Sequence, residues 1–132
     1  MVIFTVACLL GCGRVNGRRT GVSPVTQHDP AYFAVMERGH DLERRKNYAA
    51  AITTFREALS LCDGLDHDIR RKAKIAVHNR LGACYRSEGN LHAALHEFST
   101  SVDLGDAKFA PIAMEKLRRS GLVPGKPRLK IK

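Results

Sequence analysis

The fold is decided by residues 81–101, which read LGACYRSEGNLHAALHEFSTS. The same pattern occurs 43 residues earlier in the chain, where residues 38–58 read RGHDLERRKNYAAAITTFREA. The matched pairs are Gly39 and Gly82, Leu42 and Tyr85, Asn47 and Asn90, Ala51 and Ala94, Phe55 and Phe98, and Ala58 and Ser101. A fixed period of this kind indicates that one supersecondary unit occurs twice in the chain.

Both copies show the spacing of amphipathic helices, because apolar residues recur at steps of three and four. The second helix of each copy is indicated by Tyr48, Ala51, Ile52, Phe55, Ala58 and Leu59, and by Leu91, Ala94, Leu95, Phe98 and Val102. The first helix is indicated by Tyr32, Val35, Met36, Gly39 and Leu42, and by Ala73, Val77, Leu81, Cys84 and Tyr85. No part of the sequence suggests strands, so we predict an all-α chain in which each copy is a helical hairpin.

Capping residues set the expected starts of three helices. Asp29 precedes Pro30, which gives an N-cap followed by proline at the first helical position, where the missing N–H costs nothing. Asn47 and Asn90 are expected to cap the second helix of each hairpin.

Two glycines are expected to end helices in the left-handed conformation. Gly89 precedes the Asn90 cap, and Gly64 follows an apolar helix end at Leu61. Either Asp66 or Asp68 is expected to open the long helix that comes next.

The doubled pattern resembles the tetratricopeptide repeat. The resemblance rests on Leu81, Gly82, Tyr85, Ala94, Phe98 and Ser101 in the second copy, and on Gly39, Ala51, Phe55 and Ala58 in the first. In that family the glycine and the alanine let paired helices approach closely, and the aromatic residues fill the interior of the hairpin. The resemblance therefore implies stacked antiparallel helix pairs.

The chain departs from the family pattern at several places. The first copy has Arg38 and Leu42 where the second has leucine and tyrosine, and Val35 and His78 stand where the family often has tryptophan. The period exceeds the usual repeat length by about nine residues. We expect residues 63–71 to absorb this excess.

A further helix is expected between residues 106 and 120. Its apolar positions at helical spacing are Phe109, Ile112, Ala113 and Leu117. Either it begins at Asp106 and tolerates Pro111 in its second turn, or it begins near Pro111, which we favour. The predicted domain, residues 29–120, is then two tetratricopeptide-like hairpins plus a closing helix, a short α-solenoid. Because stacked repeats usually need three or more units, we expect a partner or self-association to add stability.

The chain begins with an apolar run over residues 1–10, too short to cross a bilayer as a helix but long enough for the apolar part of a secretory signal. Leu9-Leu10-Gly11-Cys12 resembles the bacterial lipobox, which implies lipid attachment at Cys12 and a location in the bacterial cell envelope. Residues 13–28 would then be a flexible basic linker. No Lys or Arg precedes the run, so three alternatives stay open: an ordinary cleaved signal, an uncleaved anchor, and a cytoplasmic protein whose true start differs.

The formal charge of +9 is unevenly distributed. All 13 acidic residues and 15 of the 22 basic ones lie between residues 29 and 120, so this region carries +2 and its flanks carry +7. The flanking charges are Arg14, Arg18 and Arg19, and in residues 121–132 Lys126, Arg128, Lys130 and Lys132. We expect these flanks to be disordered and solvated. The main alternative function is binding of an anionic polymer or lipid through them, and nucleic acid is not the expected partner.

The residue types that carry catalysis do not form a recognisable site. His92 and His96 lie four residues apart on one predicted helix, but no third metal ligand is evident. Cys84 lies on the packing stripe without an adjacent base, which is typical of a small buried side chain and not of a nucleophile. We expect no enzymatic activity, no metal and no cofactor.

The remaining candidate site is a surface. In tetratricopeptide proteins the first helix of each hairpin lines a concave groove that takes an extended peptide or a partner helix. The resemblance assigns to this groove Phe33, Met36, His40 and Glu43 from the first copy, and Asn79, Ala83 and Arg86 from the second. Phe33 and Met36 would give apolar contacts, Asn79 would hold a peptide backbone, and Arg86 would pair with a carboxylate. The sequence thus predicts a protein-binding module or scaffold, and the alternative is that these residues are ordinary solvent-facing positions.

Overall fold

The computed structural model describes residues 29–121, and every regular element in this range is helical. The elements in chain order are α1 (Pro30–Arg44), α2 (Tyr48–Leu61), the short 3₁₀ helix η1 (Cys62–Gly64), α3 (His67–Ser87), α4 (Leu91–Asp103) and α5 (Phe109–Arg119). The all-α class predicted from the sequence is therefore confirmed for these residues.

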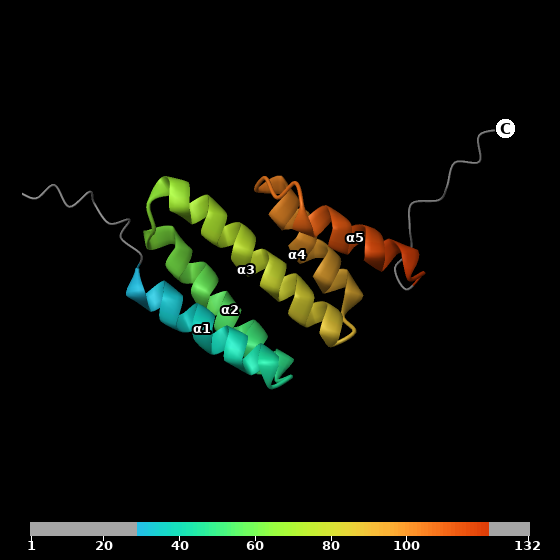
Figure 1. Cartoon of the computed structure of the whole chain (residues 1–132), viewed down its shortest axis with the longest axis horizontal. Coiled ribbons are helices and arrows are strands. Elements are labelled where there is room, and N and C mark those ends of the chain that lie inside the picture. Colours follow the sequence, from blue (N-terminus) through green and yellow to red (C-terminus); the bar gives the residue numbers. More distant parts are fainter. Residues whose placement is uncertain (1–28, 122–132) are drawn as a thin grey trace, which may run out of the picture.

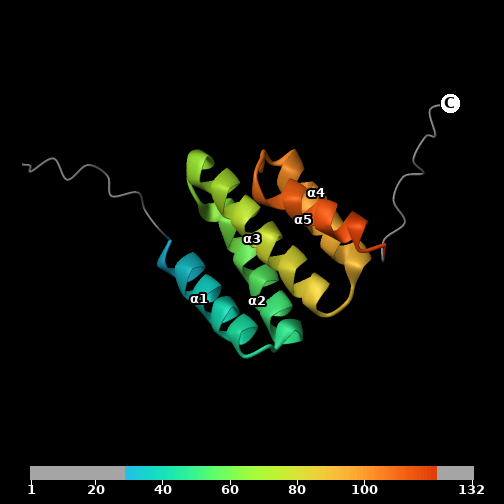
Figure 2. The same cartoon turned by 45° about the vertical axis from the view of Figure 1, so that its right-hand side comes forward.

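Each helix packs against its neighbours in the chain. Short turns join α1 to α2 and α3 to α4, so each pair runs antiparallel (Figure 1). The second pair packs on the first through α3 and α2, and α5 packs on α4 at the opposite end of the row from α1 (Figure 2). The core consequently runs through the row as a series of helix–helix contacts.

The predicted N-caps are confirmed. The Asp29 carboxylate accepts from the Ala31 N–H at 2.9 Å. The side-chain oxygens of Asn47 and Asn90 accept from backbone N–H groups three residues on, in both cases at 3.3 Å. Each asparagine satisfies one of the donors that a helix start leaves unpaired.

The turns before these two asparagines have the same shape. Gly89 has φ +81°, as predicted for a left-handed helix exit, and Lys46, 43 residues earlier, has φ +58°. In both turns the asparagine N–H donates back to a helix carbonyl at 2.9 Å. Only the second turn has the glycine that suits this backbone.

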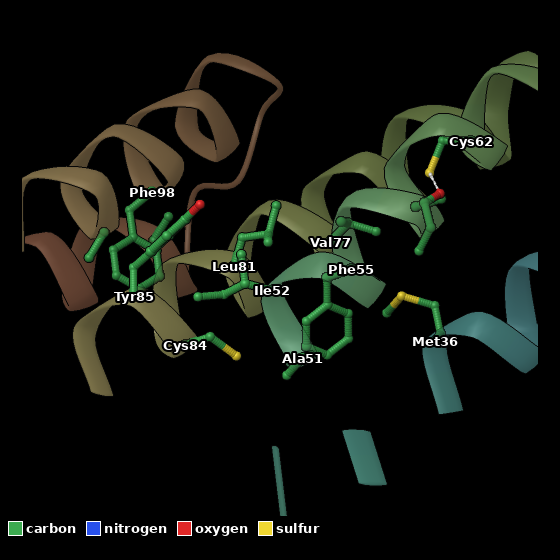
Figure 3. Packing of buried hydrophobic residues seen from close by; sticks show 14 of the residues in the cluster. Met36, Ala51, Ile52, Phe55, Cys62, Val77, Leu81, Cys84, Tyr85 and Phe98 are labelled. Atoms are coloured by element: carbon green, nitrogen blue, oxygen red, sulfur yellow. Dashed lines mark hydrogen bonds between the residues drawn. The ribbon is translucent and has the colours of Figure 1, made fainter. Parts of the chain in front are cut away.

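The two phenylalanines of the repeat explain why positions 39 and 82 are glycine. Phe55 and Phe98 are fully buried, and Figure 3 shows them among the core side chains. A Cβ built on Gly39 would lie 2.5 Å from the Phe55 ring, and one on Gly82 would lie 2.7 Å from the Phe98 ring. Carbon atoms cannot approach so closely, so each ring occupies the space that a side chain at the glycine would need.

The other repeat positions are also packing positions. The first copy buries Ala51 and Ala58 completely, and the second buries Ala94 completely and Tyr85 almost so. The small alanines admit the neighbouring helix closely, and the Tyr85 hydroxyl accepts a hydrogen bond from Arg56 of α2. Phe55, Phe98 and these residues therefore support the predicted pairing of the two copies.

One predicted helix boundary is wrong and another is confirmed. Gly64 is not left-handed, because η1 continues the chain beyond α2 and directs Leu65 into the core, where it is buried. The α5 helix begins at Phe109, two residues before Pro111, so the favoured start near the proline is confirmed and the alternative start at Asp106 is not. Pro111 lies within the first turn of α5, where a missing N–H leaves no hydrogen bond unmade.

Candidate protein-binding groove

Two hollows lie next to each other on the side of the molecule formed by the first helices of the hairpins and α5. The α1–α3 hollow, about 720 Å³, is lined by Glu37, His40, Asp41, Glu43, Arg44 and Arg80. The α3–α5 hollow, about 240 Å³, is lined by Ala76, Asn79, Arg80, Ala83 and Phe109. Because Arg80 lines both, the hollows adjoin at this side chain, and we call the pair the α1–α3–α5 groove.

The α1–α3 hollow is polar and its charges are largely paired. Arg80 Nη1 and His40 Nδ1 each lie 3.6 Å from the same Glu43 carboxylate oxygen, and Arg44 pairs with Asp41. Glu37 makes no ion pair with any residue between 29 and 121. This end of the groove therefore presents one carboxylate that is not neutralised by a neighbour.

The α3–α5 hollow is lined mostly by small or apolar groups. Ala76 and Ala83 leave space beside α3, and the half-exposed Phe109 ring forms the α5 wall, tilted against the Phe98 ring at 6.2 Å between centroids. Arg80 lies where this hollow meets the α1–α3 hollow. An aliphatic or aromatic side chain fits this composition, and a charged group fits the Arg80 end.

Asn79 contributes an unusual polar atom to this wall. Its amide Nδ2 donates to Asp106 Oδ2 at 2.7 Å, which fixes the amide orientation, because an ionised carboxylate only accepts. The Oδ1 atom is then buried and has no hydrogen-bond partner among residues 29–121. An unpaired buried acceptor costs about 1–3 kcal/mol, and because this oxygen is closed to solvent, a ligand in the hollow reaches it only if the Asn79 side chain shifts.

Asp106 holds the α5 wall in place. Its Oδ1 accepts from the backbone N–H groups of Lys108 and Phe109, at 2.9 and 3.0 Å. Its Oδ2 accepts from the Ala110 N–H at 3.0 Å, besides the Asn79 bond. Asp106 thus joins the start of α5 to the middle of α3.

The same contacts set the acidity of Asp106. Burial opposes ionisation and by itself raises the pKa, but the hydrogen bonds from Asn79 and from three backbone N–H groups outweigh it and lower the pKa to about 2. The carboxylate is therefore ionised throughout the neutral range, as its capping role requires.

Only some of the predicted groove residues line the two hollows. His40 and Glu43 line the α1–α3 hollow, and Asn79 and Ala83 line the α3–α5 hollow. Phe33 is 43 % exposed but, like the exposed Arg86, lines neither hollow.

Met36 is placed against expectation. It is only 9 % exposed and projects from α1 into the core, so its side chain cannot give the apolar groove contact predicted for it (Figure 3).

Several residues that line the groove were not predicted from the sequence. Arg80 and Ala76 fall three and seven residues before Ala83, on the same side of α3, so helical spacing from the predicted residue would have found them. Helical spacing predicts Phe109 on the packing side of the last helix, but in the structure this residue is 52 % exposed. Its position depends on where α5 starts, which the sequence did not settle.

The second hairpin also holds a mostly buried polar pair outside the groove. His78 Nδ1 lies 2.7 Å from Glu97 Oε2, between α3 and α4. The equivalent residues of the first hairpin are Val35 and Thr54, and the Thr54 hydroxyl donates to the Ala50 carbonyl of its own helix at 2.9 Å. The pair joins two helices of one hairpin and lines neither hollow.

The residue types that carry metal or nucleophilic chemistry are dispersed. Within residues 29–121 no three His, Cys, Asp or Glu side chains are arranged to hold a metal ion. Cys62 and Cys84 are free and buried, and burial raises the pKa of their thiols to about 11 and about 12. Both thiols are therefore protonated at neutral pH and poor nucleophiles.

Comparisons with known protein families, with curated proteins and with solved structures found no match. None of the helices between residues 29 and 121 combines the length and the apolar character needed to span a membrane. Cys12, the linker of residues 13–28 and the basic residues of the C-terminal tail lie outside the described residues. The lipid-attachment and tail predictions accordingly stay predictions.

Proposed function

We propose that this chain is a non-enzymatic protein-binding module whose hairpins form a short tetratricopeptide-like solenoid, and that an extended segment of a partner protein lies in the α1–α3–α5 groove. The observation that carries the proposal is that the two hollows adjoin at Arg80, on the side of the molecule formed by α1, α3 and α5. A ligand that follows both hollows would cross α3 and touch helices from both hairpins and from α5.

The repeated geometry supports the solenoid part of the proposal. The same ring-against-glycine contact and the same asparagine cap occur in both hairpins. The α5 helix packs on α4 as α3 packs on α2, which is the place of the first helix of a third unit. In a stacked array of this kind, the first helices of successive units share one side and form its binding surface.

The chemistry of the groove supports an extended peptide as the ligand. Asn79 lines the α3–α5 hollow, and a shift of its side chain that exposed the buried, unpaired Oδ1 would let this oxygen accept a backbone N–H, which every residue of an extended chain except proline offers. The α3–α5 hollow would take an apolar side chain of the peptide beside Phe109. Arg80 would pair with a carboxylate, and the unneutralised Glu37 with a cation.

A substitution that fills the groove tests the proposal. The full chain would be screened against a displayed library of random peptides, and the selected peptides remeasured against Ala76→Arg. Ala76 is an exposed α3 residue in the α3–α5 hollow, so the longer side chain should obstruct a ligand without disturbing the core. We expect affinity to fall about tenfold or more, and binding to survive about 0.5 M salt because apolar contact contributes to it.

Ala49→Arg is the matched control. Ala49 is an exposed alanine of α2 that lines neither hollow, and its substitution adds the same side chain and charge. Affinity should remain within about twofold of the unmodified chain. Selected peptides that lose equal affinity with both variants, or no peptide selected at all, would refute binding in this groove.

Attachment to a membrane through Cys12 is a separate part of the proposal. It is supported by the lipobox-like sequence that ends in Cys12. Expression in a bacterium with a radiolabelled or clickable fatty acid should label the chain and send it to the membrane fraction, and Cys12→Ala should abolish both. Labelling that persists in Cys12→Ala would exclude this cysteine as the attachment site.

A further inference from the structure

The outward side of α5 combines exposed apolar and basic side chains. Ala110, Ala113 and Leu117 bury the inner side of the helix against α4. On the opposite side Ile112 is 60 % exposed. A shallow hollow of about 370 Å³ lies over this side, and among residues 29–121 its lining comes from α5 alone, namely Pro111, Ile112, Glu115, Lys116 and Arg119.

Helical spacing places the cations around Ile112. At 100° per residue, Lys116 and Arg119 follow Ile112 at four and seven positions and therefore lie on its side of the helix. Glu115, on the same side, is paired with Arg119 at 2.8 Å. An exposed aliphatic residue flanked by cations is typical of helices that lie in a membrane interface.

Most of the net positive charge of the chain lies in the part of the sequence that begins with α5. Residues 29–107 contain 12 acidic and 11 basic residues, which gives a net charge of −1. Residues 108–132 contain eight basic residues and one acidic residue, Glu115, which gives +7. The domain up to α5 is thus close to neutral, and the strong positive charge begins where α5 begins.

We propose that the outward side of α5 docks on an anionic lipid bilayer, with Pro111 and Ile112 entering the boundary between headgroups and acyl chains and Lys116 and Arg119 lying among the lipid phosphates. Charge complementarity selects an anionic partner, at about fivefold in affinity for each Lys or Arg near the surface. The aliphatic group at the centre selects a bilayer over a nucleic acid, because a phosphate backbone offers isoleucine no apolar partner. This surface is distinct from the α1–α3–α5 groove, and its role does not depend on the proposed peptide binding.

Co-sedimentation of the full chain with vesicles tests the proposal. Phosphatidylcholine vesicles would be compared with vesicles in which about 30 % of the lipid is phosphatidylglycerol. We expect binding to the anionic vesicles to exceed binding to the neutral ones. Ile112→Ser should reduce the anionic binding about fivefold through lost apolar contact, and Lys116→Glu about tenfold through reversed charge.

Two further variants are expected to strengthen anionic binding or to leave it unchanged. Glu115→Gln frees Arg119 and removes the one negative charge of this side, so it should strengthen anionic binding about two- to fivefold. Lys72→Glu makes the same charge reversal on an exposed α3 residue that forms no ion pair within the described chain, and should leave binding within about twofold. Unchanged far-UV circular dichroism in every variant would show that the helices are intact.

Three outcomes would overturn the proposal. The first is anionic binding that ignores Ile112→Ser and disappears when Lys126, Arg128, Lys130 and Lys132 are replaced by alanine, because the tail alone would then be responsible. The second is equal loss from Lys72→Glu and Lys116→Glu, which would indicate an unspecific response to charge. The third is binding to double-stranded DNA, insensitive to Ile112→Ser, that outcompetes the anionic vesicles.

Discussion

The two hairpins make the same central contact but differ in almost everything around it. Each places a fully buried phenylalanine ring against a glycine of the preceding helix. Beside that contact, the first hairpin has Val35 and Thr54 where the second has the His78–Glu97 pair. The close approach of the two helices is therefore what the repeat conserves within this chain, and the surrounding positions are free to take polar or apolar groups.

The comparison also shows how the two hollows differ in composition. Phe33 and His40 of α1 correspond to Ala76 and Ala83 of α3. His40 lines the polar α1–α3 hollow, whereas Ala76 and Ala83 give the α3–α5 hollow small apolar walls. Repeat-equivalent positions thus share a backbone setting and differ in the surface that they present.

The largest expected effect is the removal of either ring. Phe55→Ala and Phe98→Ala each leave a cavity in the core and should lower the free energy of unfolding by about 3–5 kcal/mol, measured by urea unfolding followed by far-UV circular dichroism. Phe33→Ala, at a 43 % exposed ring, should cost less than about 1 kcal/mol. A loss of unfolding free energy below 1 kcal/mol for only one of Phe55→Ala and Phe98→Ala would mean that the two rings do not stabilise their hairpins equally.

A smaller loss is expected from the glycines that face the rings. Gly39→Ala and Gly82→Ala put a methyl group where the ring lies and should each cost about 1–3 kcal/mol, despite the better helix propensity of alanine. Gly64→Ala is the control, because a Cβ there meets nothing within 4 Å. Its unfolding free energy should be unchanged or slightly higher, and an equal loss at all three glycines would show that the rings are not the cause.

Asp106 and Asp63, its counterpart in the first hairpin, should contribute differently to the loss of stability at acid pH. The folded-state pKa of Asp106 is lowered to about 2, so its contribution is complete above the unfolded pKa near 4 and is lost as pH falls toward 2. We expect about 1–2 kcal/mol of stability at pH 7 to depend on it, after allowance for solvent screening. Asp106→Asn should therefore flatten the fall in unfolding free energy between about pH 4 and pH 2.

Asp63→Asn provides the comparison for that experiment. The Asp63 carboxylate accepts a hydrogen bond from Lys74 at 2.7 Å, and this bond lowers its pKa, but the group is exposed to solvent. We expect its replacement to leave most of the acid dependence in place. An acid profile changed more by Asp63→Asn than by Asp106→Asn would contradict the capping role of Asp106.

The smallest expected effect concerns the two matched turns. Lys46 holds φ +58° with a side chain that disfavours this conformation, so Lys46→Gly should raise the free energy of unfolding by about 0.5–1 kcal/mol. Gly89→Ala, at φ +81°, should lower it by about 1 kcal/mol. Thermal unfolding would detect both changes, and shifts of the same sign would show that the two turns are not equivalent.

Features that depend on local sequence were predicted correctly. The caps at Asp29, Asn47 and Asn90 follow from the residue and its immediate neighbours, and the equivalence of Phe55 with Phe98 and of Gly39 with Gly82 follows from the repeat. The fold class required nothing more than helical spacing. These parts of the fold are encoded within about one helical hairpin of sequence.

Features that depend on distant contacts were missed. Gly64 does not leave the helix in the left-handed conformation because Leu65 is drawn into a core made by other helices. The sequence did not predict that Asp106 accepts hydrogen bonds from the first N–H groups of α5 while Asn79, 27 residues earlier, donates to the same carboxylate. Met36 and Asn79 are repeat-equivalent, yet only Asn79 lines a hollow, because the neighbours of α1 and α3 differ. The spacing of residues along the sequence does not predict these contacts between distant residues.

The ring-against-glycine contacts also bear on how the chain folds. Each joins residues only 16 positions apart, Gly39 to Phe55 and Gly82 to Phe98, so the loop that must close is short. Chains dominated by such local contacts refold within about microseconds to milliseconds. Either hairpin is able to form first and act as the template for the other, so kinetic traps from wrong long-range pairing should be few.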